Sequence, residues 1–276
     1  MATAIRSSPG DARPGVFSAN PASNCLLAAM IQREKALGEA LITPLLRTRS
    51  LKSGEVLYNP GDEIEYIHFP HSGLISLRAI LIDGKMLETA IVGSEGAVGG
   101  MAGLGPKIAL TQAVVETPSI VSSVEAHSFR RVAGQNDGLC PFLLLHTQML
   151  LVEIQVNGVC NAFHSVRQRF ARWILERADR LHEEEVAFTH EHFSTLLGVR
   201  RSSVTEAARL QKIRGSVNYS RGRIVILDRN RLELEACECY AALKGHLKRL
   251  SGNAGAVTTS PSANKFAFAP KPAIPG

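Results

Sequence analysis

Residues 189–227 constrain the fold of this chain more than any other segment. Phe193, Leu196 and Leu197 recur at positions i, i+3 and i+4, which is the pattern of a helix with one buried face. Gly198 follows directly, where a residue in the left-handed conformation ends a helix at low cost. The segment therefore begins with a predicted short helix and a tight turn.

A second helix is predicted after that turn. Val199 fills the turn, and the apolar residues beyond it form a buried stripe: Val204, Ala207, Ala208 and Ile213. The opposite face carries donors and acceptors for base edges and phosphates: Arg201, Ser202, Thr205, Glu206 and Arg209. Such a face is typical of a helix that binds in the major groove of DNA.

A β-hairpin is predicted behind the second helix. Residues 217–219 and 223–227 are rich in β-forming side chains and flank the turn signal Ser220-Arg221-Gly222. The whole segment is therefore predicted to be a winged helix-turn-helix. The alternative is an ordinary helical hairpin with a solvated polar face, but the Gly-Val turn, the Ala-Ala step and the arginines of the hairpin favour DNA binding.

Charge is distributed unevenly along the chain, which has 276 residues and a formal net charge of +6. Residues 164–250 contain 17 Lys and Arg against 11 Asp and Glu, and the rest contains 14 of each. All the excess positive charge is thus expected around the helix-turn-helix, where contacts to a polyanion gain from counterion release. No basic amphipathic helix with exposed aromatic residues accompanies it, so a membrane is not the expected partner.

The ends of the chain carry no expected structure. Residues 1–24, rich in Ser, Ala, Pro and Gly without an apolar core, predict a flexible arm rather than a secretory signal. Residues 251–276, rich in Pro, Ala and Ser, predict a disordered tail. No run of about eighteen apolar residues occurs, which argues against a transmembrane span.

The cysteines are odd in number, and their spacing matches no zinc-binding pattern: Cys25, Cys140, Cys160, Cys237 and Cys239. We expect free thiols in a reducing cytoplasm and no metal. Cys237 and Cys239 are two residues apart, and on a helix such positions point away from each other.

Short β-rich runs separated by turns fill residues 51–129. Asn59-Pro60-Gly61-Asp62 and Asp83-Gly84 are turn signals, and residues 93–105 form a glycine-dense loop. Many short strands at this spacing predict a β-sandwich or a barrel-like roll. The roll is either a plain scaffold or the holder of a small-molecule pocket under the glycine-dense loop.

A long apolar helix is predicted between the two halves. Apolar residues follow each other at spacings of three and four over three heptads: Phe142, Leu145, Met149, Val152, Val156, Val159 and Phe163. This rhythm predicts a two-helix seam and a homodimer, which a helix-turn-helix protein needs to bind a two-fold operator. A second set lies off the seam and is expected to pack on the roll: Leu144, Leu151 and Ile154.

In this order, the predicted elements resemble the Crp/Fnr family of bacterial transcription regulators over about residues 40–240. The resemblance is carried by Gly54, Pro60-Gly61, Ser72-Gly73, Gly93-Ser94-Glu95-Gly96, the seam helix, residues 196–204 and Ser220-Arg221-Gly222-Arg223-Ile224. It implies an α+β fold with an N-terminal β-roll of the cyclic-nucleotide-binding kind (a double-stranded β-helix), a dimerisation helix and a C-terminal winged helix-turn-helix. It also implies a cytoplasmic protein whose partners are double-stranded DNA, a second copy of the chain and RNA polymerase.

The expected organisation follows from these segments. The units are an arm over 1–24, a β-roll sensor domain with a leading helix over 25–138, the dimerisation helix over 139–163, the DNA-binding domain over 164–250 and a tail over 251–276.

The resemblance implies that the first residues of the recognition helix contact bases. Here these are Arg201, Ser202, Thr205 and Glu206, of which Arg201 suits guanine and Glu206 suits cytosine. Because family members often carry an acidic residue in place of Ser202 and a basic one in place of Glu206, the half-site is expected to differ from theirs. Phosphate contacts are expected from Ser203, Arg209, Arg221 and Arg223. An ion pair between Glu206 and Arg209 is the alternative role for these two residues.

The predicted effector pocket consists of Gly93, Glu95, Gly96, Thr111 and Gln112. Members that bind cyclic nucleotides carry an arginine where this chain has Thr111-Gln112-Ala113. Because a buried phosphate without a cationic partner is costly, cAMP is not the expected effector, and backbone N–H groups of residues 96–100 are the alternative cradle.

No cofactor is expected. An iron–sulfur cluster lacks ligands, since only Cys25 precedes the roll and the roll itself contains no cysteine. Haem is not expected either, although His68, His71 and His127 are available. The signal is either an unidentified small molecule or absent.

Two other classes of function compete with a DNA-binding regulator. An enzyme is not expected, because the sequence has no P-loop, no Gly-x-Ser-x-Gly elbow and no His-Glu-x-x-His helix, and His190 and His192 do not converge on a helix. The other class is a regulatory module of the cyclic-nucleotide type that acts through a protein partner, against which the winged segment argues.

Overall fold

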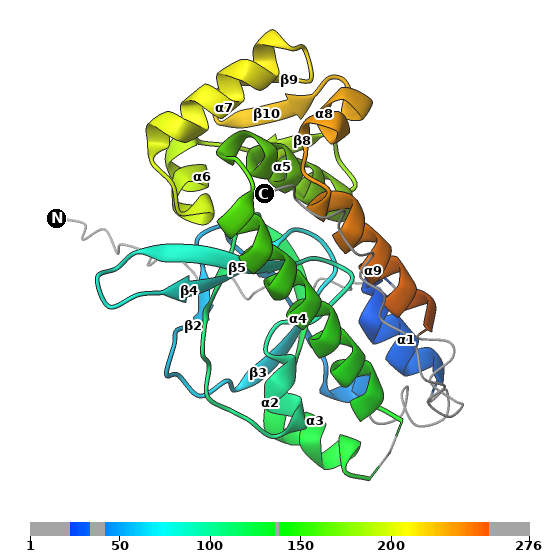
Figure 1. Ribbon diagram of the computed structural model, residues 1–276. Coiled ribbons are helices and arrows are strands. Elements are labelled where there is room, and N and C mark those ends of the chain that lie inside the picture. Colours follow the sequence, from blue (N-terminus) through cyan, green and yellow to red (C-terminus); the bar gives the residue numbers. More distant parts are fainter. Residues whose placement is uncertain (1–22, 34–41, 136–137, 254–276) are drawn as a thin grey trace, which may run out of the picture.

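The N-terminal half of the protein is a roll of two antiparallel sheets (Figure 1). The structure is a computed structural model that describes residues 23–33, 42–135 and 138–253. The strand orders are β1-β7-β3 and β2-β6-β4-β5. The strands are β1 (Arg47–Leu51), β2 (Val56–Tyr58), β3 (Tyr66–Pro70), β4 (Ile75–Ile80), β5 (Met86–Val92), β6 (Gln112–Val115) and β7 (Ser119–Glu125). This confirms the predicted β-roll.

Turns and short helices join these strands. Gly84, with φ +80°, forms the β4–β5 turn that the Asp83-Gly84 signal predicts, because glycine adopts this conformation without steric cost. The helical pieces of this half are α1 (Cys25–Arg33), the 3-10 turn η3 (Thr43–Leu45), α2 (Gly100–Leu104) and α3 (Ala126–Ala133).

The start of the described chain is bonded to the roll. Asn24 is fully buried, and its Nδ2 donates to the carbonyls of Pro70 and Gly96 at 2.7 and 2.9 Å. The prediction of a flexible arm up to residue 24 is therefore wrong at its last residue. The rest of that arm, up to residue 22, and residues 254–276 of the predicted tail lie outside the described residues.

Apolar side chains fill the space between the two sheets. Buried residues from both sheets and from the glycine-dense loop form this core: Leu51, Ile75, Leu77, Ala90, Val92, Val98, Ala113, Val115 and Val121. In antiparallel sheets alternate residues face the core, as in the register pairs Ile75↔Val115 and Leu77↔Ala113. The interior of the roll is a packed core between the sheets.

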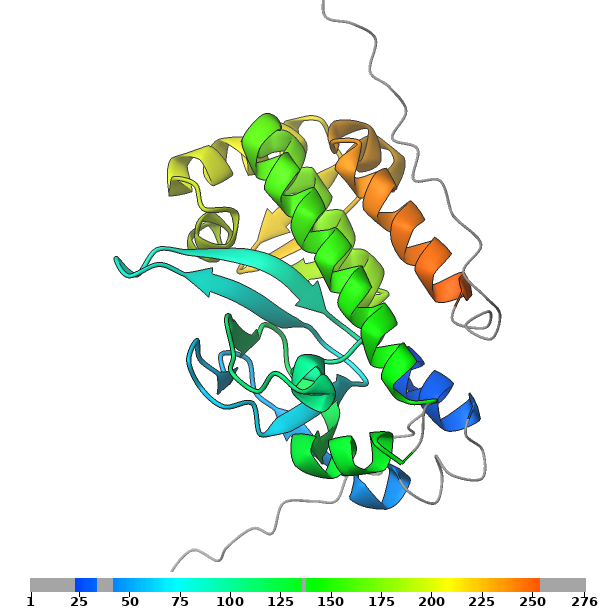
Figure 2. The same ribbon diagram turned by 60° about the horizontal axis from the view of Figure 1, so that its bottom comes forward.

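Helix α4 (Cys140–Phe163) lies along the roll, with α9 (Cys239–Asn253) beside it (Figure 2). Its side facing the roll is buried at heptad spacing, at Leu143, His146, Glu153, Asn157 and Cys160. Three of these residues are polar: His146, Glu153 and Asn157. Asn157 Nδ2 donates to the carbonyl of Thr89 at 2.7 Å, and Glu153 Oε1 accepts from the N–H of Ile91 at 3.1 Å. Polar bonds therefore fix which face of α4 meets the roll.

The opposite face of α4 is apolar and exposed. It carries five large side chains that are at least 42% exposed: Leu144, Leu151, Ile154, Val159 and Phe163. The prediction that Leu144, Leu151 and Ile154 pack on the roll is wrong, because the buried polar bonds turn another face inwards. Phe142, predicted in the seam, is 4% exposed and belongs to the core under α1 and α3.

By length and composition, α4 is also apolar enough to cross a membrane. Glu153, however, is buried and its Oε2 accepts from Arg180 Nη2 at 2.7 Å, which bonds α4 to the following helix. The same criteria are met by core helices of water-soluble proteins, so they carry no membrane assignment for this helix.

The C-terminal half is a winged helix-turn-helix, as predicted. Its elements are α5 (Val166–Leu181), β8 (Glu185–Ala187), α6 (His190–Leu197), α7 (Arg201–Ile213), β9 (Val217–Ser220), β10 (Arg223–Ile226) and α8 (Arg229–Glu235). Thr189 caps α6 by accepting from the N–H of His192, and Gly198 ends it at φ +62°. The three-stranded sheet has the order β8-β10-β9.

The helix-turn-helix packs around one aromatic and aliphatic core. Phe193 and Leu197 of α6 contribute to it, together with Val204 and Ala208 of α7. Ile213, predicted in the same stripe, is the last residue of α7 and is 67% exposed. The spacing predicts the buried face correctly up to that residue.

Candidate nucleic-acid interface

One exposed face of α7 holds all four predicted base contacts. Arg201, Ser202, Thr205 and Glu206 are exposed, whereas Ser203 is partly covered. The Thr205 hydroxyl donates to the carbonyl of Arg201 at 3.0 Å. The buried residues of α7 lie on its other side, so the local periodicity alone directs this polar face outwards.

Glu206 and Arg209 bind each other on this face. Arg209 Nε and Nη2 donate to the two carboxylate oxygens of Glu206 at 2.9 and 2.8 Å. The hydrogen bond from Arg209 holds the pKa of Glu206 below its usual value. This ion pair is the alternative that the spacing leaves open, and it must rearrange before Glu206 can accept from a base.

The wing that follows α7 carries two more arginines. Arg221 has φ +47° and forms the β9–β10 turn together with Gly222, and it has no ion-pair partner among the described residues. Arg223 pairs with Glu185 of β8 at 2.5 Å. Of the predicted phosphate contacts, Arg221 is therefore the one whose charge is not already opposed by a neighbouring carboxylate.

Arg201 is an exposed cation at the start of α7. Its side chain is 68% exposed, and its Nε lies 3.8 Å from an oxygen of Glu191 at the start of α6. At this distance and exposure the pair is weak, so Arg201 remains available to a ligand.

A group of buried arginines on α5 connects the winged domain to the roll. The Arg177 side chain is fully buried, with Nη2 2.9 Å from Glu88 Oε2 of β5 and Nε 2.7 Å from Glu116 Oε1 after β6. Arg180 binds Glu95 at 3.0 Å and Glu153 at 2.7 Å in the same way. These ion pairs cross from one domain to the other.

The two carboxylates that bind Arg177 have pKa values shifted in opposite directions. Burial raises the pKa of Glu88 to about 8 despite Arg177. Burial also disfavours ionised Glu116, but Arg177 and a hydrogen bond from His192 outweigh it and lower its pKa to about 2. Because His192 lies on α6, the helix-turn-helix itself touches this network.

The predicted effector-pocket residues have separate partners. Glu95 Oε1 accepts from the N–H of Gly93 and from Arg180, whereas Gln112 Nε2 donates to Asn59 Oδ1 at 2.9 Å. Thr111 is partly buried beside Gln112. Glu95 thus belongs to the contact between the domains and not to a site shared with Gln112.

The backbone of residues 96–98 is already hydrogen-bonded. The N–H of Ala97 donates to His146 Nε2 at 3.0 Å, and that of Val98 donates to the carbonyl of His68 at 2.8 Å. A Cβ on Gly96 would lie 2.3 Å from the His146 ring, so this glycine allows α4 to approach the loop. An anion cradle over all of residues 96–100 is therefore not available in this arrangement.

The histidines of the roll are bound to serines. His68 Nδ1 and His71 Nε2 lie 2.7 Å from the hydroxyls of Ser123 and Ser122. Burial lowers the pKa of His68 to about 4, so its ring is neutral. His127 lies at the start of α3, where it is exposed beside Glu125, the last residue of β7.

Comparison with known proteins agrees with this architecture. Residues 48–136 match the family of cyclic nucleotide-binding domains, and residues 168–235 match the family of Crp-like helix-turn-helix domains. The two matches define the class of protein: a regulator that joins a cyclic-nucleotide-type roll to a DNA-binding helix-turn-helix. Together they span more than half of the chain, which belongs to the Crp/Fnr family of transcription regulators.

Solved structures share the fold at low sequence identity. FixK2 from Bradyrhizobium japonicum is 19% identical with a TM-score of 0.62, covering 70% of this chain and 98% of its own. A CRP/FNR family regulator from Thermus thermophilus is 23% identical with a TM-score of 0.57, covering 69% and 98%. The c-di-GMP responsive regulator CLP of Xanthomonas campestris is 14% identical with a TM-score of 0.59, covering 72% and 98%. No curated protein matches the chain.

Sequence reasoning does not reveal the buried contact between the domains. The one signal for it is Glu88, an acidic residue within the apolar run of residues 86–92. An acidic residue at a core-facing strand position requires a buried cation, but the sequence does not say that Arg177 supplies it.

Proposed function

We propose that this regulator acts as a cytoplasmic homodimer that binds a palindromic operator and contacts RNA polymerase. The observation that carries the proposal is the exposed polar face of α7, with Arg201 near its start, followed by a wing whose turn carries Arg221. A guanidinium in this position suits the two acceptors of guanine in the major groove, and a wing arginine suits a phosphate.

The exposed apolar face of α4 supports dimerisation. Leu144, Leu151 and Ile154 lie on a helix that the roll covers only on the opposite side. A second α4 packed against them removes this apolar area from water and brings two winged domains together. The heptad residues Leu145, Met149, Val152 and Val156 are half-buried at the edge of the same face.

The features of the roll favour a signal other than cAMP. Its interior is a packed apolar core, and Thr111 and Gln112 provide no cation for a cyclic phosphate. Haem sensing is not part of the proposal, because His68 and His71 are hydrogen-bonded to serines.

Operator selection from random duplexes, with and without cAMP, tests this function. We expect one palindrome to be enriched equally in both pools, and Arg201→Ala protein to enrich it more weakly, with relaxed preference at one base pair of each half-site. Enrichment only with cAMP contradicts the part of the proposal that concerns the effector. No enrichment in either pool, with a folded dimer, favours a module that acts through a protein partner.

Sedimentation of a face variant tests the dimer. Leu151→Glu places a charge in the apolar face of α4 and is expected to give monomers that bind the palindrome weakly. The matched control is Leu110→Glu, the same replacement at a leucine that is 87% exposed in the loop before β6, outside α4. A dimeric Leu151→Glu protein contradicts the proposed seam.

A further inference from the structure

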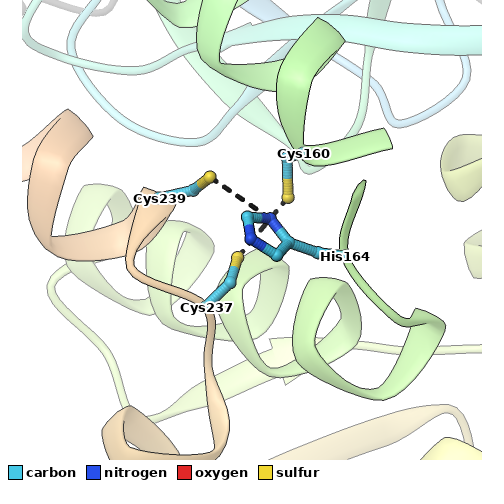
Figure 3. Close-up of side chains that lie close together, drawn as sticks. All are labelled: Cys160, His164, Cys237 and Cys239. Atoms are coloured by element: carbon cyan, nitrogen blue, oxygen red, sulfur yellow. Dashed lines mark hydrogen bonds between the residues drawn. The ribbon is translucent and has the colours of Figure 1, made fainter. Parts of the chain in front are cut away.

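Four potential metal ligands converge where α4 ends and α9 begins. Cys160 lies in the last turn of α4, and His164 follows that helix (Figure 3). Cys237 lies in the linker before α9, and Cys239 is the first residue of α9. Their sulfur and nitrogen atoms all lie within 4.8 Å of one another. Cys160 Sγ is 3.4 Å from Cys237 Sγ, and Cys239 Sγ is 3.5 Å from His164 Nδ1.

The expectation that Cys237 and Cys239 diverge is wrong. It assumes that both lie on one helix, but α8 ends at Glu235 and α9 begins at Cys239, so Cys237 lies in the linker. The linker turns both side chains towards Cys160, which is distant in sequence.

The spacing suits one tetrahedral metal ion. A zinc ion about 2.3 Å from each sulfur holds its ligand atoms about 3.8 Å apart. The distances of 3.4 and 3.5 Å are close to that value, and the outer limit of 4.8 Å is within a small side-chain adjustment. A disulfide requires about 2.0 Å between sulfurs, so the cysteines are not bonded in this arrangement.

The charge around the cluster is unbalanced without a metal. Arg172 is within electrostatic reach of all three thiols, and Arg169 is within reach of two of them. Both arginines are buried, yet only Arg172 is ion-paired, with Glu176. Within the described part of the chain, Nε of both and Nη2 of Arg172 have no hydrogen-bond acceptor. Three thiolates, a neutral imidazole and Zn²⁺ carry one net negative charge, which balances the one net positive charge left by these arginines.

His164 already has the second contact that a metal-binding histidine needs. Its Nδ1 faces Cys239, and its Nε2 lies 3.3 Å from a carboxylate oxygen of Glu238. A carboxylate on the far nitrogen fixes the tautomer and the orientation of a ligating imidazole. The three cysteines are at most 6% exposed, as in a closed structural site.

We propose that Cys160, His164, Cys237 and Cys239 bind one structural Zn²⁺ per protomer. Binding converts three thiols to thiolates and releases their three protons, with no change of oxidation state. The ion joins α9 to His164. This residue lies in the short connection between α4 and α5, the first helix of the winged domain. It therefore stabilises the junction between the two domains.

Metal analysis of the full chain, purified without chelators or added zinc, tests the site. We expect one zinc per protomer, with loss in Cys237→Ser and retention in the control Cys25→Ser, whose thiol is exposed. Replacement by Co²⁺ is expected to give the visible bands of a tetrahedral ion and charge-transfer bands from thiolate. Glu238→Gln is expected to weaken zinc binding by about 10-fold to 100-fold.

If the cysteine variants do not fold, the site is tested on the wild-type protein instead. A strong chelator is expected to lower Tm, and Zn²⁺ to restore it. Protein that is free of metal when purified and binds neither added Zn²⁺ nor Co²⁺ overturns the proposal. A disulfide between Cys160 and Cys237 in protein purified under native conditions also overturns it, in favour of a redox pair. None of these measurements depends on DNA binding.

Discussion

The arginines of α5 and α7 have opposite environments although they belong to the same positively charged part of the chain. Arg172 and Arg177 of α5 are fully buried, whereas the side chain of Arg201 on α7 is 68% exposed. The α5 arginines bind carboxylates, two of which belong to the roll, and the polar face of α7 is exposed to solvent. Equal charges in one segment thus have two environments: buried ion pairs that attach the domains, and an exposed face that we propose contacts DNA.

This difference corrects the interpretation of the charge distribution. The sequence predicts that the excess of positive charge in residues 164–250 lies around the helix-turn-helix as a surface for phosphates. Arg177 and Arg180 are instead opposed by carboxylates outside that segment, namely Glu88, Glu95, Glu116 and Glu153. The positive surface available to DNA is therefore smaller than the count of residues indicates.

The largest effect is expected from Arg177→Met. The change leaves ionised Glu116 buried without its cation and Glu88 without its hydrogen-bond donor, which costs about 3–5 kcal/mol of unfolding free energy. Denaturant unfolding measures the loss. Arg201→Met, the same replacement on the exposed helix, is the control and is expected to change stability by less than about 0.5 kcal/mol. Similar losses of unfolding free energy in both variants contradict the difference between the buried and the exposed arginines.

At Arg201 the expected effect is on DNA binding and not on stability. Arg201→Met removes a bidentate donor and is expected to cost about 1–3 kcal/mol of operator affinity and to relax specificity at one base pair. Titration of the selected operator and of its single-base variants measures this. Arg201→Lys keeps the charge but loses the fork of donors, so it should recover affinity more than specificity. Unchanged base preference in both variants assigns Arg201 to a phosphate.

The wing offers a smaller, sequence-independent effect. Arg221→Ala is expected to weaken specific and non-specific binding alike and to reduce the slope of log K against log salt by about 1. Arg223→Ala, which removes an arginine already paired with Glu185, is the matched comparison and should change the slope less. A loss confined to one operator sequence contradicts a phosphate role for Arg221.

The last effect is a change of slope with pH and concerns Glu88. Because burial raises the pKa of Glu88 from 4.5 to about 8, folding favours its protonated form, and its contribution to stability is lost as pH rises between these values. Glu88→Gln resembles the protonated side chain and is expected to make the fall of Tm with pH shallower in that window. Glu153, whose pKa burial raises to about 7, should keep part of the slope. A slope that is unchanged from the wild type contradicts this role of Glu88.

The sequence by itself determines the local elements of this protein. The helix-turn-helix, the wing and the hairpin at Gly84 follow from patterns within short stretches, because periodicity and turn chemistry act between near neighbours. The outward face of α7 follows for the same reason, since burying Val204 and Ala208 leaves Arg201 and Thr205 on the other side.

Only the tertiary structure decides which distant residues meet. Arg177 and Glu88 are 89 positions apart, and Cys160 and Cys237 are 77 positions apart, so no local pattern relates them. Likewise, the apolar residues of α4 allow more than one inward face, and the buried bonds of Glu153 and Asn157 select one. The physical reason is that a buried polar group must find its partner wherever the packed domains place it.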